Sequence, residues 1–181
     1  AIFYYNIKDN NTVEVTYQST NGTDTYTGVI TIPQQVTYNG TTYQVDRIGY
    51  SAFSMSALVE VVIPDNITFI GANAFRLCGS LEKVTMTDAV TTIGYQAFAA
   101  CQQLREINLS ENLEVIPIGC FSWCDSLKTI TLPHSLKSIE REGFRGTKNL
   151  KTIICKAWDR PTWENEDVFD AAVKSNATLI A

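Results

Sequence analysis

The sequence predicts a right-handed α/β repeat solenoid built from five coils of about 23 residues each. Three observations predict it: a hexad ending in phenylalanine recurs, a leucine follows each copy, and a short strand pattern follows each leucine. The phenylalanines step by 22 residues once and then by 23 residues three times, at positions 53, 75, 98, 121 and 144. Five coincident columns do not arise by chance, so the chain is one stack of similar units.

The hexads predict the inward-facing turn of each coil. Three of them carry an Ile-Gly pair, at Ile48–Phe53, Ile70–Phe75 and Ile93–Phe98. Two later copies, Ile116–Phe121 and Ile139–Phe144, keep the isoleucine and the phenylalanine but lose the glycine. We expect each hexad to form one or two helical turns with its small residue and its Phe on the inner side.

A strand pattern follows each leucine. Apolar residues alternate with polar ones, as in Val84 and Met86 or in Ile107 and Leu109. Alternation with a period of two indicates a half-buried strand. A coil is therefore expected to contain a strand, a bend, a short second strand and a helical turn. Stacking the coils aligns Leu on Leu and Phe on Phe, which buries side chains that no single coil could bury.

Both ends of the stack are expected to be capped. Residues 1–47 form an N-terminal β cap that includes the first repeat strand, 48–155 form the solenoid, and 156–181 form an irregular C-terminal cap. Asn39-Gly40 between two alternating apolar runs predicts a β-hairpin, and Asn21-Gly22 predicts another turn. The C-terminal cap is expected to hold a plug of bulky side chains: Trp158, Pro161, Trp163 and Phe169.

Charge and hydropathy argue against nucleic-acid binding and against a transmembrane segment. The net charge is −5 and the isoelectric point is near 4.9, whereas binding to nucleic acid needs a basic face. No apolar run reaches the ~18–20 residues of a membrane-spanning helix. We therefore expect no nucleic-acid partner and no transmembrane segment in this chain.

The cysteines and the single histidine are the residues that could carry reactive chemistry. Cys78, Cys101 and Cys124 recur three residues after a Phe, which could indicate a metal site or a disulfide ladder. A spacing of one coil places thiols in single file, and no CxxC pair completes a zinc site, so buried structural thiols are favoured. His134 is expected to be a solvated loop residue without a nucleophile around it. No catalytic residue, metal ligand or cofactor is therefore predicted, and the chain is not expected to be an enzyme.

The consensus Ile-Pro-x-x-Val-x-x-Ile-Gly-x-x-Ala-Phe-x-x-Cys-x-x-Leu-x-x-Ile resembles the BspA-like leucine-rich repeats of bacterial surface proteins, especially those of Bacteroidetes. The resemblance extends from about Ile30 to Cys155, and the segment from Phe3 to Thr16 resembles the N-terminal cap of the family. It implies a leucine-rich-repeat fold in an exported protein, secreted or associated with the outer membrane at the cell surface, often through a lipid anchor upstream of Ala1. It also implies adhesion, because some members bind host matrix proteins or other bacteria.

The resemblance further implies that the strands line a concave face where ligands dock. A non-catalytic adhesion module that binds a protein or a glycan there is the leading hypothesis. A solvated sheet face on a structural spacer is the alternative, since charges that alternate down one column can simply pair across strands. Two outward columns supply the candidate ligand-binding residues: Glu60, Lys83, Glu106 and Thr129 in one, and Val62, Thr85, Asn108 and Thr131 in the other.

Overall fold

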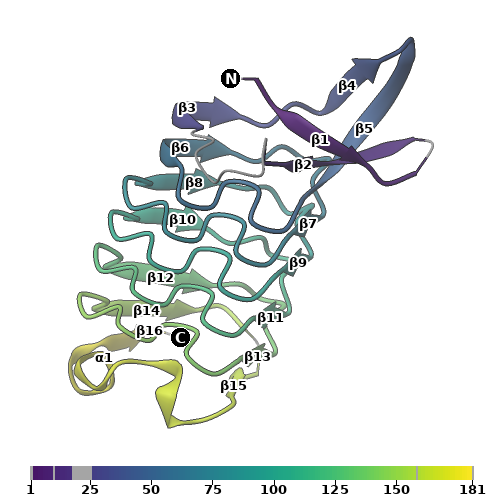
Figure 1. Ribbon diagram of the computed structural model, residues 1–181. Coiled ribbons are helices and arrows are strands. Elements are labelled where there is room, and N and C mark those ends of the chain that lie inside the picture. The colour runs from purple at the N-terminus through teal and green to yellow at the C-terminus, as the bar shows by residue number, and fades with distance from the viewer. Residues whose placement is uncertain (1, 10, 18–25, 158, 181) are drawn as a thin grey trace.

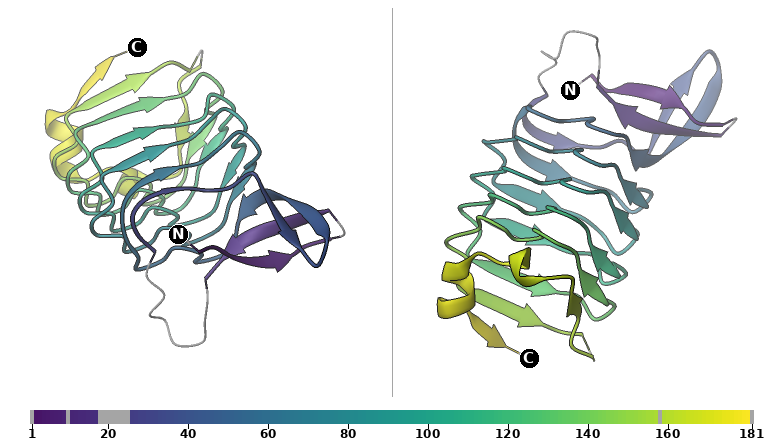
Figure 2. Two further views of the ribbon diagram at one scale, coloured as in Figure 1. Left: turned by 90° about the horizontal axis from the view of Figure 1, so that it is seen from above. Right: turned by 60° about the horizontal axis from the view of Figure 1, so that its bottom comes forward.

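The computed structural model describes residues 2–9, 11–17, 26–157 and 159–180. The chain winds into a solenoid whose coils stack along one axis, with two projecting hairpins at the N-terminal end and a short helix at the other (Figures 1 and 2). Each coil contributes one strand to each of two sides of the stack, and on both sides neighbouring strands pair in parallel except at one interruption described below. The solenoid fold is thereby confirmed.

The long-strand sheet is our name for the side that carries the predicted outward columns. It consists of β3 (Thr27–Thr31), β6 (Ala57–Val62), β8 (Lys83–Thr85), β10 (Glu106–Asn108), β12 (Thr129–Leu132), β14 (Thr152–Cys155) and β16 (Thr178–Ile180). The short-strand sheet lies on the other side. It consists of β5 (Thr41–Ile48), β7 (Phe69–Ile70), β9 (Thr92–Ile93), β11 (Val115–Ile116), β13 (Ser138–Ile139) and β15 (Thr162–Trp163).

The N-terminal cap extends the short-strand sheet. Strand β1 (Tyr4–Ile7) pairs antiparallel with β2 (Thr12–Thr16), and β2 pairs in parallel with β5. Strand β4 (Gln35–Tyr38) pairs antiparallel with β5, so the hairpin predicted at Asn39-Gly40 is confirmed. Both turn residues have positive φ angles, of 50° and 77°, as a two-residue type I′ turn requires. The turn predicted at Asn21-Gly22 lies outside the described residues.

A column of stacked phenylalanine rings forms the centre of the core. The hexad phenylalanines are all fully buried, and the centroids of consecutive rings lie between 5.1 and 5.6 Å apart. The rings are nearly parallel, with interplanar angles of 3° for Phe75 on Phe98 and 18° for Phe121 on Phe144. The predicted alignment of Phe on Phe is confirmed, because the coil spacing brings equivalent residues into direct contact.

The hexads form turns, and the predicted helical turns do not occur. Each turn holds two residues in the left-handed region four positions apart, such as Asn73 at φ 57° and Leu77 at φ 64°. The amides of Asn73, Phe75 and Leu77 donate to carbonyls of the next coil at 2.7–3.0 Å. A helix would need uninterrupted right-handed residues and bonds within its own coil. This outward bonding makes the turns a third ladder along the stack, which we call the turn ladder.

The α/β description is therefore not confirmed for the repeats, which form a β-solenoid. In the part of the chain that the structure describes, the helices are η1 (Glu166–Val168) and α1 (Ala171–Asn176), both in the C-terminal cap. Neither is long and apolar enough to cross a membrane.

The C-terminal cap continues the repeat although its sequence pattern does not. The Phe169 ring stacks on Phe144 with centroids 5.3 Å apart, and Trp163 packs edge-on against Phe169. Strands β15 and β16 pair with β13 and β14. The step from Phe144 to Phe169 is two residues longer than the regular step of 23, which hides the continuation in the sequence. Two residues of the predicted plug thus belong to a further coil, whereas Trp158 lies outside the described residues.

Both sheets are interrupted between the segment from β9 to β10 and the next segment, from β11 to β12. The long-strand sheet breaks between β10 and β12, and the short-strand sheet breaks between β9 and β11. Gly94 packs so closely on the preceding coil that a Cβ atom there would lie 2.3 Å from the Ala72 amide nitrogen. The next hexad has Pro117 at this position, which adds a ring and lacks the N–H that Gly94 donates to Ile70. The following coil is therefore set off from its neighbour on both sides.

Candidate binding surfaces

The structure places the predicted columns in register on the long-strand sheet. Lys83 lies between Glu60 and Glu106, and Thr85 lies between Val62 and Asn108. The alternate strand residues Val61, Val84 and Ile107 are buried, so the column residues point outward. The remaining two predicted residues, Thr129 and Thr131, lie on β12 beyond the interruption, opposite Thr152 and Ile154 of β14. The set is thus divided into a group of six and a group of two.

The charges on this sheet are partly paired. Lys83 Nζ lies 3.2 Å from Glu106 Oε1, as expected for cross-strand pairing of opposite charges. Both side chains are well exposed, so the pair contributes no more than about 1 kcal/mol to stability. Within the described residues Glu60 forms no ion pair within 4.0 Å. Its carboxylate is therefore available to a ligand without breaking an existing contact.

A second surface lies on the turns and was not predicted as a site. Tyr50, Tyr95 and Trp123 are about half exposed there. Met55 and Leu77 are exposed beside them, at 66% and 42%. These five residues form what we call the turn-face patch. Exposed aromatic and apolar side chains of this kind typically anchor partners, whereas the long-strand sheet presents no aromatic side chain at the predicted positions.

The backbone beneath the turn-face patch is unusual for bulky residues. Met55, Leu77 and Trp123 have φ angles of 62° to 64°, a region that favours glycine or asparagine. The residue equivalent to Trp123 in the next turn is Gly146, and a Cβ there would lie 2.6 Å from the Trp123 ring. The indole therefore lies flat against the following coil, with Lys148 Nζ 5.9 Å from its centroid. Bulky side chains therefore occupy positions where glycine would be less strained.

Glu111 joins three coils at the bend after the long strands. Its carboxylate contacts Lys156 Nζ at 2.5 Å and His134 Nδ1 at 2.9 Å, and it also accepts a bond from the His134 amide. The hydrogen bond from Lys156, followed by those from His134, lowers the pKa of Glu111 to about 2. The His134 side chain is half exposed, in agreement with the expected loop position. We call the contacts that Glu111 makes with His134 and Lys156 the charged ladder.

The recurring thiols are core groups, as predicted. Cys78, Cys101 and Cys124 are fully buried, and their Sγ atoms donate to phenylalanine carbonyls of the preceding coil at 3.0–3.2 Å. Burial raises the pKa of Cys78 and of Cys124 to about 12, so neither forms a thiolate near neutral pH. Among the residues that the structure describes, no group of three or more His, Cys, Asp or Glu side chains is placed to hold a metal ion.

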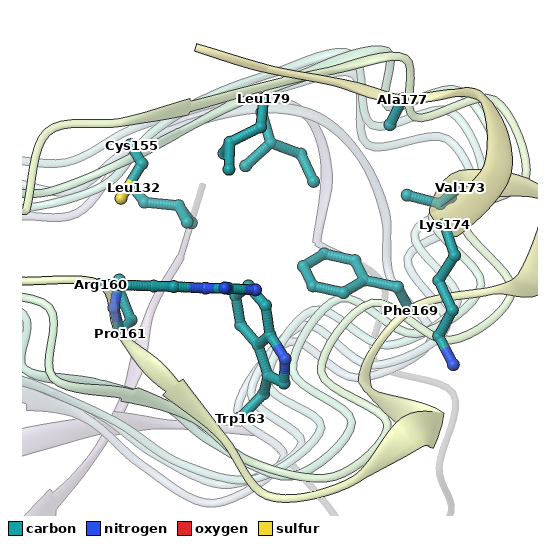
Figure 3. Close-up of a pocket in the computed structure, with 11 residues that line it drawn as sticks. Leu132, Cys155, Arg160, Pro161, Trp163, Phe169, Val173, Lys174, Ala177 and Leu179 are labelled. Carbon is teal, nitrogen blue, oxygen red and sulfur yellow. The ribbon is translucent and has the colours of Figure 1, made fainter. Parts of the chain in front are cut away.

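A pocket lies at the C-terminal end of the stack, between β16 and α1 on one side and β15 on the other (Figure 3). This C-terminal pocket encloses about 250 Å³, and most of its lining is apolar. Arg160 and Lys174 are its only cationic lining residues among those described. This pocket could not be predicted from the sequence, because Arg160 and Lys174 lie outside the repeating columns. The walls are formed by Leu132, Ile153, Cys155, Pro161, Trp163, Phe169, Val173, Ala177 and Leu179.

A shallower groove follows the interruption of the short-strand sheet. It measures about 410 Å³ and lies between the edges of β9 and β11. Thr92 and Ile93 line one side, and Glu114 and Val115 line the other. The groove marks where backbone pairing is lost rather than a convergence of reactive side chains.

The chain was compared with known families and structures. A model of the BspA type leucine-rich repeat region matches residues 44–159 in six copies. A comparison with curated proteins found no match. Among solved structures, a leucine-rich repeat protein of T. pallidum is 28% identical, with a TM-score of 0.72, over 84% of this chain and 68% of that chain.

Two further solved structures are similar. A leucine-rich cell surface protein from Faecalibacterium prausnitzii A2-165 is 27% identical, with a TM-score of 0.56, over 90% of this chain and 55% of that chain. A leucine-rich repeat protein from Bacteroides capillosus ATCC 29799 is 29% identical, with a TM-score of 0.52, over 84% of this chain and 93% of that chain. The present chain thus spans little more than half of the Faecalibacterium protein.

The matched region contains the columns described above. It covers the five hexads and the strands on both sides of the stack, from within β5 to beyond β14. Six copies are matched and six strands form the short-strand sheet in the described chain, so the predicted count of five coils is not confirmed. On both sequence and structure, this chain belongs to the BspA-type leucine-rich repeat family.

Proposed function

We propose that this chain is a non-catalytic interaction module of an exported bacterial surface protein, and that it binds a protein or a glycan on the long-strand sheet. The observation that carries the proposal is the pair of outward columns, which the solenoid holds in register across three successive strands. Such rigid spacing fixes polar groups before binding and so reduces the entropy lost when a partner docks. Membership of a repeat family and the cell-surface name of the Faecalibacterium protein support an extracytoplasmic location.

The turn-face patch is the second candidate surface. Aromatic and apolar side chains contribute most of the affinity at protein interfaces, and here Met55, Leu77 and Trp123 are exposed on a backbone with positive φ angles. A partner that docks on the turns would bury Tyr95 and Trp123 and would leave the polar columns untouched. The two surfaces therefore make different predictions for the same binding measurement.

A binding screen against glycans and host matrix proteins, followed by two sets of variants, separates these surfaces. The sheet set replaces Glu60, Lys83, Glu106 and Asn108 with alanine. The turn set replaces Tyr50, Tyr95 and Trp123 with serine. The matched control replaces Lys137 and Glu114 with alanine, because they form an exposed Lys–Glu pair at 2.8 Å on the short-strand side.

Loss of binding in the sheet set, with the turn set and the control unchanged, supports docking on the long-strand sheet. Loss in the turn set alone would move the site to the turns and overturn that assignment. If the screen finds no partner, the result would instead favour the hypothesis that the chain is a structural spacer, which holds another domain away from the cell surface. Circular dichroism of each variant is the control for an intact solenoid.

A further inference from the structure

The C-terminal pocket combines a mostly apolar lining with an exposed cation, Arg160. Figure 3 shows the Arg160 side chain extending inward above Trp163, with Leu132 and Leu179 on the opposite wall. The guanidinium carbon lies 4.6 Å from the centroid of the Trp163 ring, so the cation is held over an aromatic face. The ring fixes where this charge lies within the pocket.

The two cations of the pocket differ in their partners. Lys174 Nζ lies 3.1 Å from Glu166 Oε2, so its charge is already paired. Within the described ranges, no carboxylate lies within 4.0 Å of the Arg160 guanidinium. A guanidinium presents several donors in a planar fork that matches the two oxygens of a carboxylate. Among the described residues, Arg160 is thus a guanidinium without a carboxylate partner, and it lies beside an apolar cavity.

We infer that the C-terminal pocket binds a small aliphatic carboxylate, with its chain among Leu132, Phe169 and Leu179 and its head group on Arg160. The inference is independent of where a macromolecular partner docks, since none of the residues proposed for either binding surface lines this pocket. Burial of the ligand's alkyl chain favours binding, and its carboxylate gains a charge-assisted hydrogen bond from Arg160 in a partly desolvated site.

The size of the pocket limits the ligand. Its volume of about 250 Å³ is just below the ~300–1,000 Å³ typical of small-molecule sites, so it fits a short chain rather than a folded element. Octanoate is the probe of choice. Octanol and octylammonium have the same chain with a neutral or a cationic head group, and they therefore isolate the contribution of the carboxylate.

Calorimetric titration of the whole chain tests the inference. We expect octanoate to bind at least about tenfold more tightly than octanol, and octylammonium not to bind, because Arg160 repels it. Arg160→Gln removes the charge from an exposed side chain and should weaken octanoate to the level of octanol. The matched control is Lys151→Gln, an exposed cation outside the pocket, which should leave the affinity unchanged.

Cys155 provides a second readout that does not depend on heat signals. It is the partly exposed thiol of the pocket, whereas the other four cysteines are fully buried. Alkylation by N-ethylmaleimide, followed by mass spectrometry of the Cys155 peptide, should therefore report on occupancy. Octanoate should slow the reaction several-fold in the wild type and not in Arg160→Gln.

Three outcomes would overturn the inference. The first is octanoate that neither binds nor protects Cys155. The second is equal affinity for octanoate and octanol, or equal protection in Arg160→Gln, since the pocket would then select only for an apolar chain. The third is a short peptide with a C-terminal leucine that binds more tightly than octanoate, which would identify a peptide carboxylate as the occupant.

Discussion

The coils with a glycine at the second hexad position and the coil with Pro117 at that position meet their neighbours in different ways. Gly49, Gly71 and Gly94 each lie so close to the preceding coil that an added Cβ would come within 3 Å of its backbone. These coils share unbroken pairing along the short-strand sheet from β5 through β9. After Pro117 replaces the glycine, pairing stops on both sheets and begins again one coil later.

This difference shows that neighbouring coils are joined by separate sets of hydrogen bonds, of which one can be lost while the others remain. Across the interruption the turn ladder persists, with Phe98 donating to Cys120 at 3.0 Å and Ala100 to Ser122 at 2.7 Å. Glu111 also spans it on the long-strand side through His134. Glycine at the second hexad position therefore permits the close approach that Pro117 prevents, whereas the turns and the Phe column keep the coils stacked across the interruption.

The largest expected effect tests the element that both groups of coils share. Phe98→Ala removes a fully buried ring from the middle of the column and should lower the free energy of unfolding by about 3–5 kcal/mol. Phe169→Ala, at the partly exposed end of the same column, should cost clearly less. Chemical denaturation of both variants measures the two values. Equal losses would mean that the column does not stabilise its centre more than its end.

The next effect tests the close approach directly. Gly71→Ala places a Cβ 2.6 Å from the Gly49 carbonyl carbon, so the coils must separate, at a cost of about 1–3 kcal/mol. Glu140→Ala is the counterpart at the same hexad position in a later coil. It removes only the bond that the carboxylate accepts from the Ile118 amide at 2.9 Å, which is worth about 0.5–1.5 kcal/mol. A smaller loss for Gly71→Ala than for Glu140→Ala would contradict the role assigned to glycine.

Hydrogen exchange should locate the interruption without any substitution. The amides of Thr92 and Ser138 donate to the preceding coil at 3.3 Å, whereas in the described structure the amide of Val115 donates to no backbone carbonyl. We expect the Val115 amide to exchange at least about tenfold faster than the amides of Thr92 and Ser138, because it has no backbone hydrogen bond that must break before exchange. Mass spectrometry or NMR of the exchanging amides gives the rates. Similar protection at all three would show that the short-strand sheet is continuous.

The smallest effect concerns the charged ladder that spans the interruption. Folding lowers the pKa of Glu111 to about 2, chiefly through Lys156, so the carboxylate stabilises the fold above its ordinary pKa of 4.5. This stabilisation is lost as the pH falls from there toward 2. Glu111→Gln should therefore lower stability at neutral pH by less than about 1 kcal/mol, since the group is partly exposed. The difference from wild type should shrink on acidification, and a difference that grows would give the wrong sign.

The repeat columns could be predicted because side-chain volume and polarity recur with the period of the coil. Phe75, Cys101 and Leu127 each occupy a buried position whose neighbours above and below have the same kind of residue. The outward residues Glu60 and Lys83 followed from strand alternation alone. Their position and register were thus predictable, whereas their role in binding stays a proposal.

The turns and the terminal pocket could not be predicted in the same way. Met55, Leu77 and Trp123 have no side-chain property that indicates a left-handed backbone; bonds to the next coil hold them in it. Likewise, the pocket forms only because the last coil brings Val173 and Leu179 opposite Arg160 and Trp163. The sequence by itself determined the period and the core of this solenoid, since each buried position depends on one residue type. Tertiary structure alone decided the turn conformation, the interruption at Pro117 and the pocket, since these depend on how neighbouring coils fit together.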